Sequence, residues 1–443
     1  MSSDYCQRLA AHGLSTAEAE AKARLFEAAD ERVGLRSGEA AGRWFVPGRI
    51  EVLGKHTDYC GGPSLLCAAE SGMCLVAVRR TDQRVEAQDV VSGEHTTFAV
   101  SPNLETTAGW ANYLRTVVRR VARNFPGVEQ GARIAFASDL PRGSGMSSSS
   151  ALVVAIFSAL GWANRVQARP EYAANIKSRE DLAGYLGCVE NGQSFGSLAG
   201  DHGVGTFGGS EDHTAILCSQ AGQLALYRFC PVSLQRRIPL PTGYVFAVAM
   251  SGVKAVKTGD ARESYNRASL AAAEVLNALK AASGRNCSSL HELAAASPVE
   301  REELRASLTV SHPTFDLIRR FDHYCREALD IIPAAVAALE AGDLAEFGRQ
   351  VDASQKATEE LLQNQVPETM ALARLARGAG AVAASAFGAG FGGSVWALAK
   401  RTDAQRVLER WQAAYLRRFP TRAFDSRFFL TSPGPGLINL STE

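Results

Sequence analysis

The stretch that decides the fold is LPRGSGMSSSSALVVAIFSAL, residues 140–160. A proline and two glycines lead into four consecutive serines, which run directly into an apolar segment with the length of a buried helix. Glycines let a backbone approach a ligand closely, and the amide groups at a helix N-terminus attract anions. Capping the helix would need only one serine, so the pattern favours a loop that binds the phosphates of a nucleotide triphosphate.

This loop is not a Walker loop, because no lysine follows its glycines. A second glycine-rich stretch, SAFGAGFGGSVWALAK at 385–400, places Gly388, Gly390 and Gly393 at G-x-G-x-x-G spacing. A dinucleotide-binding turn should open a helix, whereas a strand-like run follows this one. We therefore reject a dinucleotide site and predict a glycine turn between two strands.

Short β-branched and apolar runs alternate with alanine-rich stretches along the chain, which predicts a mixed α and β protein. The expected strands are residues 74–80, 133–138, 381–387 and 394–400. The expected helices include residues 150–166, 264–282 and 331–363. The change to helix-rich sequence in the second half places a domain boundary near residue 210, which gives domains of residues 1–210 and 211–443.

The bulk composition limits the kind of partner. The 443 residues carry 47 basic and 46 acidic side chains, so no excess charge draws the protein to nucleic acid or to an anionic membrane. No apolar run approaches the roughly 20 residues that cross a bilayer, and the N-terminus lacks the order of a secretion signal. The nine cysteines form no CxxC pair. We expect a cytoplasmic protein with free thiols and small-molecule partners.

A third stretch, PGRIEVLGKHTDYCGG at 47–62, precedes the other two. In this order the three stretches resemble the signatures of the GHMP kinases, a family named for galactokinase, homoserine kinase, mevalonate kinase and phosphomevalonate kinase. The H-T-D-Y core is similar to the galactokinase signature in particular. GWANYL at 109–114, GSEDH at 209–213 and RRFDHYCRE at 319–327 resemble further segments of that family. The resemblance spans roughly residues 42–400.

The resemblance implies a two-domain α/β (α+β) GHMP kinase fold with the active site in the cleft between the domains. It implies a mixed sheet of ribosomal-protein-S5-like topology in the N-terminal domain and a ferredoxin-like C-terminal domain. The implied activity is the ATP-dependent phosphorylation of the anomeric C1 hydroxyl of galactose or a close relative. Mg²⁺ would be the cofactor, and the enzyme would be a monomer.

The resemblance also assigns residues to the nucleotide. Adenine is expected near Trp110 and Tyr113, and magnesium at Ser148 and Glu190. The phosphates are expected along the serine loop, at Gly143, Ser144, Gly145, Met146, Ser147, Ser148, Ser149 and Ser150.

The sugar and the chemistry are assigned in the same way. The implied sugar-binding residues are Lys55, His56, Asp58, Tyr59, Gly209 and Tyr265. Asp212 is expected to orient or deprotonate the sugar hydroxyl, and Arg49 to keep Asp212 ionised and to stabilise charge on the phosphoryl group. Asp212 could instead cap a helix, with Glu211 as a rival base, and Arg49 could be a structural arginine.

Three residues depart from the usual galactokinase pattern. Glu51 stands in place of asparagine, Lys55 in place of glutamate and His213 in place of glutamine, and the segment 191–211 is longer than usual. A lysine at position 55 suits a carboxylate, so a galacturonokinase-like uronic acid 1-kinase is one alternative. Lys55 could also pair with Glu51 or Glu211, or swing to solvent, and never touch the sugar.

Two further alternatives remain open. One is a non-catalytic regulator that binds sugar and ATP. The other is a phosphotransferase for an isoprenoid or amino-acid alcohol, which the H-T-D-Y core disfavours.

Overall fold

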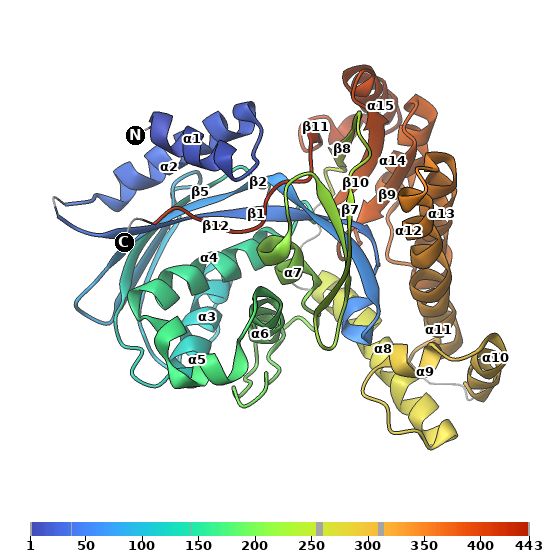
Figure 1. Ribbon diagram of the computed structural model, residues 1–443, viewed down its shortest axis with the longest axis horizontal. Coiled ribbons are helices and arrows are strands. Elements are labelled where there is room, and N and C mark those ends of the chain that lie inside the picture. The colour runs from blue at the N-terminus through green and yellow to red at the C-terminus, as the bar shows by residue number, and fades with distance from the viewer. Residues whose placement is uncertain (1, 37, 142, 254–259, 309–313, 442–443) are drawn as a thin grey trace.

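The computed structural model of the chain describes residues 2–36, 38–141, 143–253, 260–308 and 314–441. The described residues form a large mixed sheet and a smaller second sheet (Figure 1). The large sheet has the strand order β12-β1-β2-β5-β3-β4, with β6 attached to β2 and β7 to β6. Its strands are β1 (Ala41–Leu53), β2 (Pro63–Arg79), β3 (Arg84–Asp89), β4 (His95–Ala99), β5 (Ala132–Ser138), β6 (Gln223–Arg228), β7 (Ser233–Pro239) and β12 (Ile438–Asn439).

The pair β3 and β5 is parallel and the other pairs of this sheet are antiparallel, so the sheet is mixed as predicted. Helices cover both faces (Figure 1). On one face lie α1 (Ser2–Ala11) and α2 (Thr16–Val33), which share a core with β1, β2 and β5. The other face carries α3 (Ala111–Asn124), α4 (Ser148–Ala163), α5 (Pro170–Asn175), α6 (Arg179–Asn191) and α7 (Glu211–Cys218).

Helix α4 grows out of the serine loop and is buried around most of its circumference. Its apolar residues join the main hydrophobic core together with side chains of β1, β2, α3 and α6. A helix that is apolar on every side belongs in a protein interior. The core therefore fixes the direction of α4, and with it the place of its N-terminus.

The second sheet is antiparallel throughout, with the strand order β11-β8-β10-β9. Its strands are β8 (Tyr244–Met250), β9 (Ala383–Phe387), β10 (Ser394–Lys400) and β11 (Arg427–Thr431). The chain visits them in the order β8, helices, β9, β10, helix and β11, which is the βαββαβ path of a ferredoxin-like unit. The predicted class of the C-terminal part is confirmed.

Helices also cover both faces of the second sheet. One face packs on α14 (Pro367–Ala379) and α15 (Ala404–Arg418). The other carries α13 (Leu344–Ala357), where Phe347 stacks on Trp396 within the main core, and α12 (Ile332–Glu340) packs against α13. The expected single helix over 331–363 is interrupted, because Gly342 adopts a left-handed φ of 71° and Asp343 caps α13.

A lobe of four helices follows β8, and its core encloses Cys60 from the N-terminal part. These helices are α8 (Asp260–Ser283), α9 (Leu290–Ala294), α10 (Pro298–Ser307) and α11 (Leu317–Cys325). Residues 326–331 continue α11 as a π-helical turn, and a second such turn covers residues 358–362. These helices belong to the second half of the chain, and through Cys60 they contact the end of the H-T-D-Y loop.

The sheets bear on the domain boundary without deciding it. Strands β6 and β7 follow residue 211, yet they belong to the first sheet, because β6 pairs with β2 and β7 pairs with β6. The change from one sheet to the other falls between Pro239 and Tyr244. The division at residues 210 and 211 stays a prediction. Among the described helices, none combines the length and the apolar character needed to cross a membrane.

Candidate active site

A cavity of about 760 Å³ lies between the large sheet, the N-termini of α4 and α7, and the glycine turn that joins β9 to β10. It brings together almost all of the residues that the sequence predicted for the site. The exceptions are Lys55, Ser144 and Met146, which do not line it. Residues far apart in the chain thus meet in one place.

The serine loop bends through a series of left-handed residues before α4 begins at Ser148. Gly143, Gly145 and Ser147 have φ values of 69°, 76° and 60°. A Cβ atom added to Gly145 would lie 3.3 Å from the carbonyl oxygen of Phe387, at the end of β9. The loop is therefore pressed against the glycine turn of the second sheet, which supports it from the C-terminal half.

The two loop residues outside the cavity have structural positions. The Ser394 hydroxyl donates a hydrogen bond to the carbonyl oxygen of Ser144 at 2.6 Å. Met146 is fully buried in the main core, and its carbonyl oxygen accepts a hydrogen bond from the Arg49 backbone N at 3.3 Å. The backbone carbonyl groups of Ser144 and Met146, together with the buried Met146 side chain, hold the loop in place, and neither residue lines the cavity.

Arg49 and Asp212 form an ion pair in the wall of the cavity. Arg49 Nε donates to Asp212 Oδ1 at 2.8 Å, and Arg49 Nη1 donates to the carbonyl oxygen of Gly145 at 2.5 Å. The Ser150 hydroxyl lies 2.8 Å from Glu190 Oε2 and 3.3 Å from Asp212 Oδ2. Burial works against the Arg49 charge, but the nearby carboxylates, Asp212 foremost, raise the pKa of its guanidinium above the ordinary value.

Glu211, the rival of Asp212, faces a different partner. Its Oε2 accepts a hydrogen bond from the Ser64 hydroxyl at 3.0 Å, on β2. Burial, together with the charges of Glu51 and Asp58, raises the pKa of Glu211 well above its ordinary value. Asp212 is therefore the carboxylate beside the cationic Arg49, while Glu211 favours its neutral form.

The H-T-D-Y loop presents several predicted sugar-binding residues. His56 has a left-handed φ of 56°, its Nδ1 lies 2.7 Å from the Tyr59 hydroxyl, and its Nε2 lies 3.2 Å from the Ala389 carbonyl oxygen. Arg320 of α11 donates to the His56 carbonyl oxygen at 2.7 Å. The unusual backbone of His56 is thus stabilised from two elements of the C-terminal half.

Asp58 lies at the start of a 3-10 turn, Asp58–Cys60, and its Oδ2 accepts a hydrogen bond from the Glu211 backbone N at 3.2 Å. Burial raises the pKa of Asp58, although hydrogen bonds from the backbone of Glu211 and Tyr59 oppose the shift. A Cβ atom on Gly209 would lie 2.2 Å from Asp58 Oδ2, so only glycine fits there. Asp58, Tyr59, Gly209 and Tyr265 all line the cavity.

Lys55 is predicted to contact the sugar, but in the structure it does not line the cavity. It is 1% exposed, and its Nζ donates to the Ser354 hydroxyl of α13 at 3.2 Å. Ser354 donates in turn to Glu327 Oε1 at 3.0 Å, which also accepts the Gly54 backbone N at 2.9 Å. Burial raises the pKa of Glu51, and the Lys55 charge is the strongest influence that lowers it. The geometry favours the interpretation in which Lys55 neutralises buried carboxylates.

The sequence matches three family models: the galactokinase galactose-binding signature over residues 36–80, the N-terminal domain of GHMP kinases over 112–192, and the C-terminal domain of GHMP kinases over 335–417. This chain belongs to the GHMP kinases. The family membership predicted from the sequence is confirmed.

Relatives of this GHMP kinase include the galactokinase of Actinobacillus pleuropneumoniae serotype 5b, which is 29% identical over 364 residues, covering 80% of this chain and 84% of that protein. The galactokinase of Roseiflexus sp. is 29% identical over 372 residues, covering 84% of this chain and 86% of that one. The solved structure of Lactococcus lactis galactokinase complexed with galactose has a TM-score of 0.76 at 21% identity and covers 94% of this chain and 99% of that chain. The structural likeness shows that the fold is shared.

The donor set of this GHMP kinase suits magnesium brought in by a nucleotide. Ser148 and Glu190 both line the cavity, and hydroxyl and carboxylate oxygens are the ligands that Mg²⁺ prefers. Within the described ranges no cluster of three or more His, Cys, Asp or Glu side chains could hold a metal by itself.

His213 lies against Glu190, with its Nε2 atom 3.1 Å from Glu190 Oε2. Neither ring nitrogen has a hydrogen bond of good geometry to the described residues. This departure from the family pattern therefore lies beside Glu190, the candidate magnesium ligand.

Part of the cavity wall is formed by residues that no sequence motif marks. The residues are Asp89, Val91, Ser92 and Glu94, at the end of β3 and in the turn to β4. Asp89 Oδ1 accepts hydrogen bonds from the backbone N of Val91 at 2.9 Å and of Ser92 at 3.3 Å. No motif marks this turn, so only the fold could bring it to the site.

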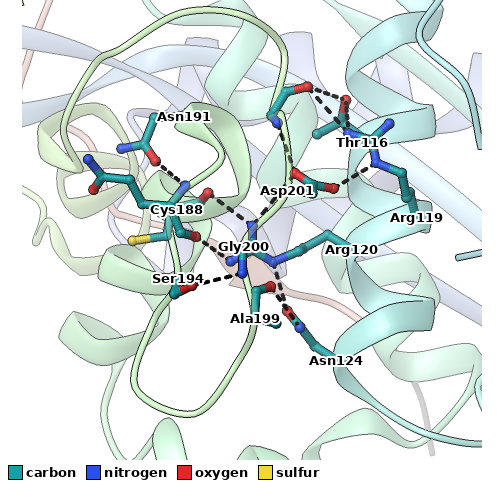
Figure 2. A network of polar contacts seen from close by, with 12 residues as sticks. Thr116, Arg119, Arg120, Asn124, Cys188, Asn191, Ser194, Ala199, Gly200 and Asp201 are labelled. Carbon is teal, nitrogen blue, oxygen red and sulfur yellow. Dashed lines mark hydrogen bonds and ion pairs between the residues drawn. The ribbon is translucent and has the colours of Figure 1, made fainter. Parts of the chain in front are cut away.

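The long segment between α6 and α7 is anchored by a buried polar network on α3 (Figure 2). Arg119 Nε lies 2.6 Å from Asp201 Oδ2, with both side chains at most 2% exposed. Asp201 Oδ1 also accepts the Gly203 backbone N at 2.8 Å, and Asn124 Nδ2 donates to the Ala199 carbonyl oxygen at 3.0 Å. Sequence reasoning identified the extra length but neither of the charges that hold it.

Asp201→Asn should lower the free energy of unfolding by about 3–5 kcal/mol at pH 7, because it leaves the buried Arg119 without its counter-charge. Burial raises the pKa of Asp201, but hydrogen bonds from Arg119 and Gly203 outweigh it and hold the pKa below its ordinary value. The pair therefore stabilises the fold above the unfolded-state pKa of about 3.9, and this contribution is lost as pH falls through the folded-state pKa.

Urea titrations of the parent and of Asp201→Asn at pH 7 and pH 3 measure this difference. The difference in the free energy of unfolding between the parent and Asp201→Asn should be largest at pH 7 and smaller at pH 3. Asp352→Asn serves as a control, since the pair of Asp352 with Arg377 is exposed and should contribute less than about 1 kcal/mol. A gap that does not depend on pH would contradict the assignment to the charge of Asp201.

Proposed function

We propose that this GHMP kinase transfers the γ-phosphoryl group of ATP to the C1 hydroxyl of galactose. One observation carries the proposal: a single cavity joins the serine loop to the H-T-D-Y loop, with the Arg49–Asp212 pair between them. Phosphoryl transfer depends on positioning and on charge neutralisation more than on covalent chemistry of the protein. The galactose-binding signature and the galactokinase relatives support galactose as the acceptor.

Each residue has a defined task in this proposal. The backbone amides of the serine loop and the N-terminus of α4 bind the phosphates. Asp212 accepts the proton of the sugar hydroxyl, and Arg49 keeps Asp212 ionised. The bond from Arg49 to Gly145 holds that cation against the phosphate loop, where it can stabilise charge on the moving phosphoryl group.

Sugar recognition falls to Asp58, His56, Tyr59, Gly209 and Tyr265. A buried carboxylate that accepts bonds from sugar hydroxyls discriminates between epimers, because the wrong epimer leaves it unpaired at a cost of about 1–3 kcal/mol. The close packing of Gly209 on Asp58 fixes the direction of that carboxylate.

The same proposal includes the conditions of the reaction. Mg²⁺ neutralises the nucleotide phosphates, with Ser148 and Glu190 as its protein ligands. The enzyme acts as a monomer in the cytoplasm on the free sugar, without nucleic acid or membrane.

The alternative functions are not favoured. Lys55 lies outside the cavity, so it offers no contact for a uronate carboxylate. The serine loop and Asp212 are intact in the cavity, which speaks against a regulator without catalysis. The curated relatives reported above are galactokinases, not kinases of isoprenoid or amino-acid alcohols.

Release of ADP from galactose, glucose, galacturonate, homoserine and mevalonate, each with and without Mg²⁺, tests the function. We expect turnover with galactose in the presence of Mg²⁺, with ³¹P and ¹H NMR placing the phosphate on C1. We expect little turnover with galacturonate. A preference for galacturonate, or no ADP release from any acceptor, would overturn the proposal.

A further inference from the structure

The segment between α6 and α7, residues 192–210, has a second anchor on α8. Asn266 Oδ1 accepts a hydrogen bond from the Phe207 backbone N at 3.0 Å, and Asn266 Nδ2 donates to the Gly205 carbonyl oxygen at 3.1 Å. One amide side chain thus satisfies a donor and an acceptor two residues apart. Because an amide presents both functions in a fixed geometry, it sets the register between α8 and the segment.

Tyr265 precedes Asn266 on α8 and lines the cavity. Its ring centroid lies 5.8 Å from that of His56. A Cβ atom on Gly208 would lie 2.4 Å from the Tyr265 hydroxyl oxygen, so this hydroxyl rests on the backbone of the segment. Any shift of α8 along the segment would therefore move the Tyr265 hydroxyl relative to the sugar-binding loop.

The segment itself is held from the opposite side. The Gly203 carbonyl oxygen accepts hydrogen bonds from Arg119 Nη2 at 3.3 Å and from the Thr116 hydroxyl at 3.4 Å, next to the Arg119–Asp201 pair (Figure 2). Asn191 at the end of α6 donates to the Gly208 carbonyl oxygen at 2.7 Å. With these buried anchors in place, the two hydrogen bonds of Asn266 join α8 to a segment whose position is already fixed.

We propose that Asn266 is a positioning residue for the sugar, which docks α8 on residues 205–207 and thereby holds the Tyr265 hydroxyl at the wall of the cavity. The inference rests on the proposed galactose kinase function. A residue that merely stabilised α8 would affect both substrates alike when changed. A positioning residue separates them, because Trp110 and Tyr113 lie on α3 and its preceding turn, not on α8.

Asn266→Ala should raise the KM for galactose about tenfold, as expected when hydrogen bonds that place a ligand contact are lost, and change the KM for ATP by less than about twofold. Asn266→Asp keeps the acceptor for Phe207 but sets a carboxylate against the Gly205 carbonyl oxygen, so it should behave similarly. Asn277→Ala, an exposed position on the same helix, is the matched control and should leave both KM values unchanged.

A double-mutant cycle with Tyr265→Phe tests whether Asn266 affects the KM for galactose through the Tyr265 hydroxyl. If Asn266 acts through the Tyr265 hydroxyl, the galactose penalty of Asn266→Ala should shrink to less than about twofold in the Tyr265→Phe background. Equal penalties in both backgrounds, or equal rises in KM for galactose and ATP, would overturn the inference. Turnover of galactose by the parent tests the proposed function separately, and calorimetric galactose binding measures the Asn266 effect even without turnover.

Discussion

Asp212→Asn should lower kcat by about 10²–10⁴-fold with little change in nucleotide affinity, because the amide keeps the shape of the side chain but cannot accept the sugar proton. The structure strengthens this expectation. Asp212 Oδ1 lies 2.8 Å from Arg49 Nε, so the substitution also removes the counter-charge of a buried cation beside the phosphate loop. Steady-state kinetics with galactose, together with titration of a fluorescent ATP analogue, would separate the two effects.

The neighbouring carboxylate gives the comparison. Glu211→Gln should cost much less activity than Asp212→Asn, since Glu211 contacts Ser64 and favours its neutral form. If Asp212→Asn keeps more than half of the parent activity, Asp212 is not the base. A larger loss in Glu211→Gln than in Asp212→Asn would assign that role to Glu211.

Lys55→Met should lower the free energy of unfolding by about 3–5 kcal/mol at pH 8, because it removes a buried cation from among buried carboxylates. Burial raises the pKa of Glu51 and the Lys55 charge opposes this, so the pKa of Glu51 should rise further in the variant. A carboxyl whose folded-state pKa is raised destabilises the fold as pH rises through that range. The penalty of Lys55→Met should therefore shrink between pH 8 and pH 5.

Urea titrations at both pH values measure that change. Lys356→Met removes an exposed lysine that pairs with Glu360, so it should cost less than about 1 kcal/mol at either pH. A parent-like stability of Lys55→Met, combined with a selective loss of sugar binding, would instead return Lys55 to the sugar site.

The local signals were sufficient for much of the fold. The glycine turn between β9 and β10 was predictable because two apolar runs with strand character flank it on both sides. The break between α12 and α13 was missed, although Gly342 and Asp343 together are a common end and start of helices. The predicted cavity residues of the serine loop came from glycine, serine and helix patterns that are all local.

The role of Lys55 could not be predicted in the same way. Its partner Ser354 is 299 positions away in the chain, and no periodicity links the two. The same holds for Arg119 and Asp201, which are 82 positions apart and meet only once α3 and the long segment pack together. Charge pairs of this kind depend on tertiary structure, and one sequence does not reveal them.

Strand β12 has a consequence for how the protein is made. It supplies the edge next to β1, through the pairs Trp44 with Asn439 and Phe45 with Ile438, although it follows the whole second sheet in the chain (Figure 1). Until β12 has been translated, the edge of β1 that it covers remains unpaired. Unpaired strand edges promote association with other chains. Final closure of the N-terminal sheet therefore comes after the ferredoxin-like unit has been translated, because β12 follows that unit in the chain.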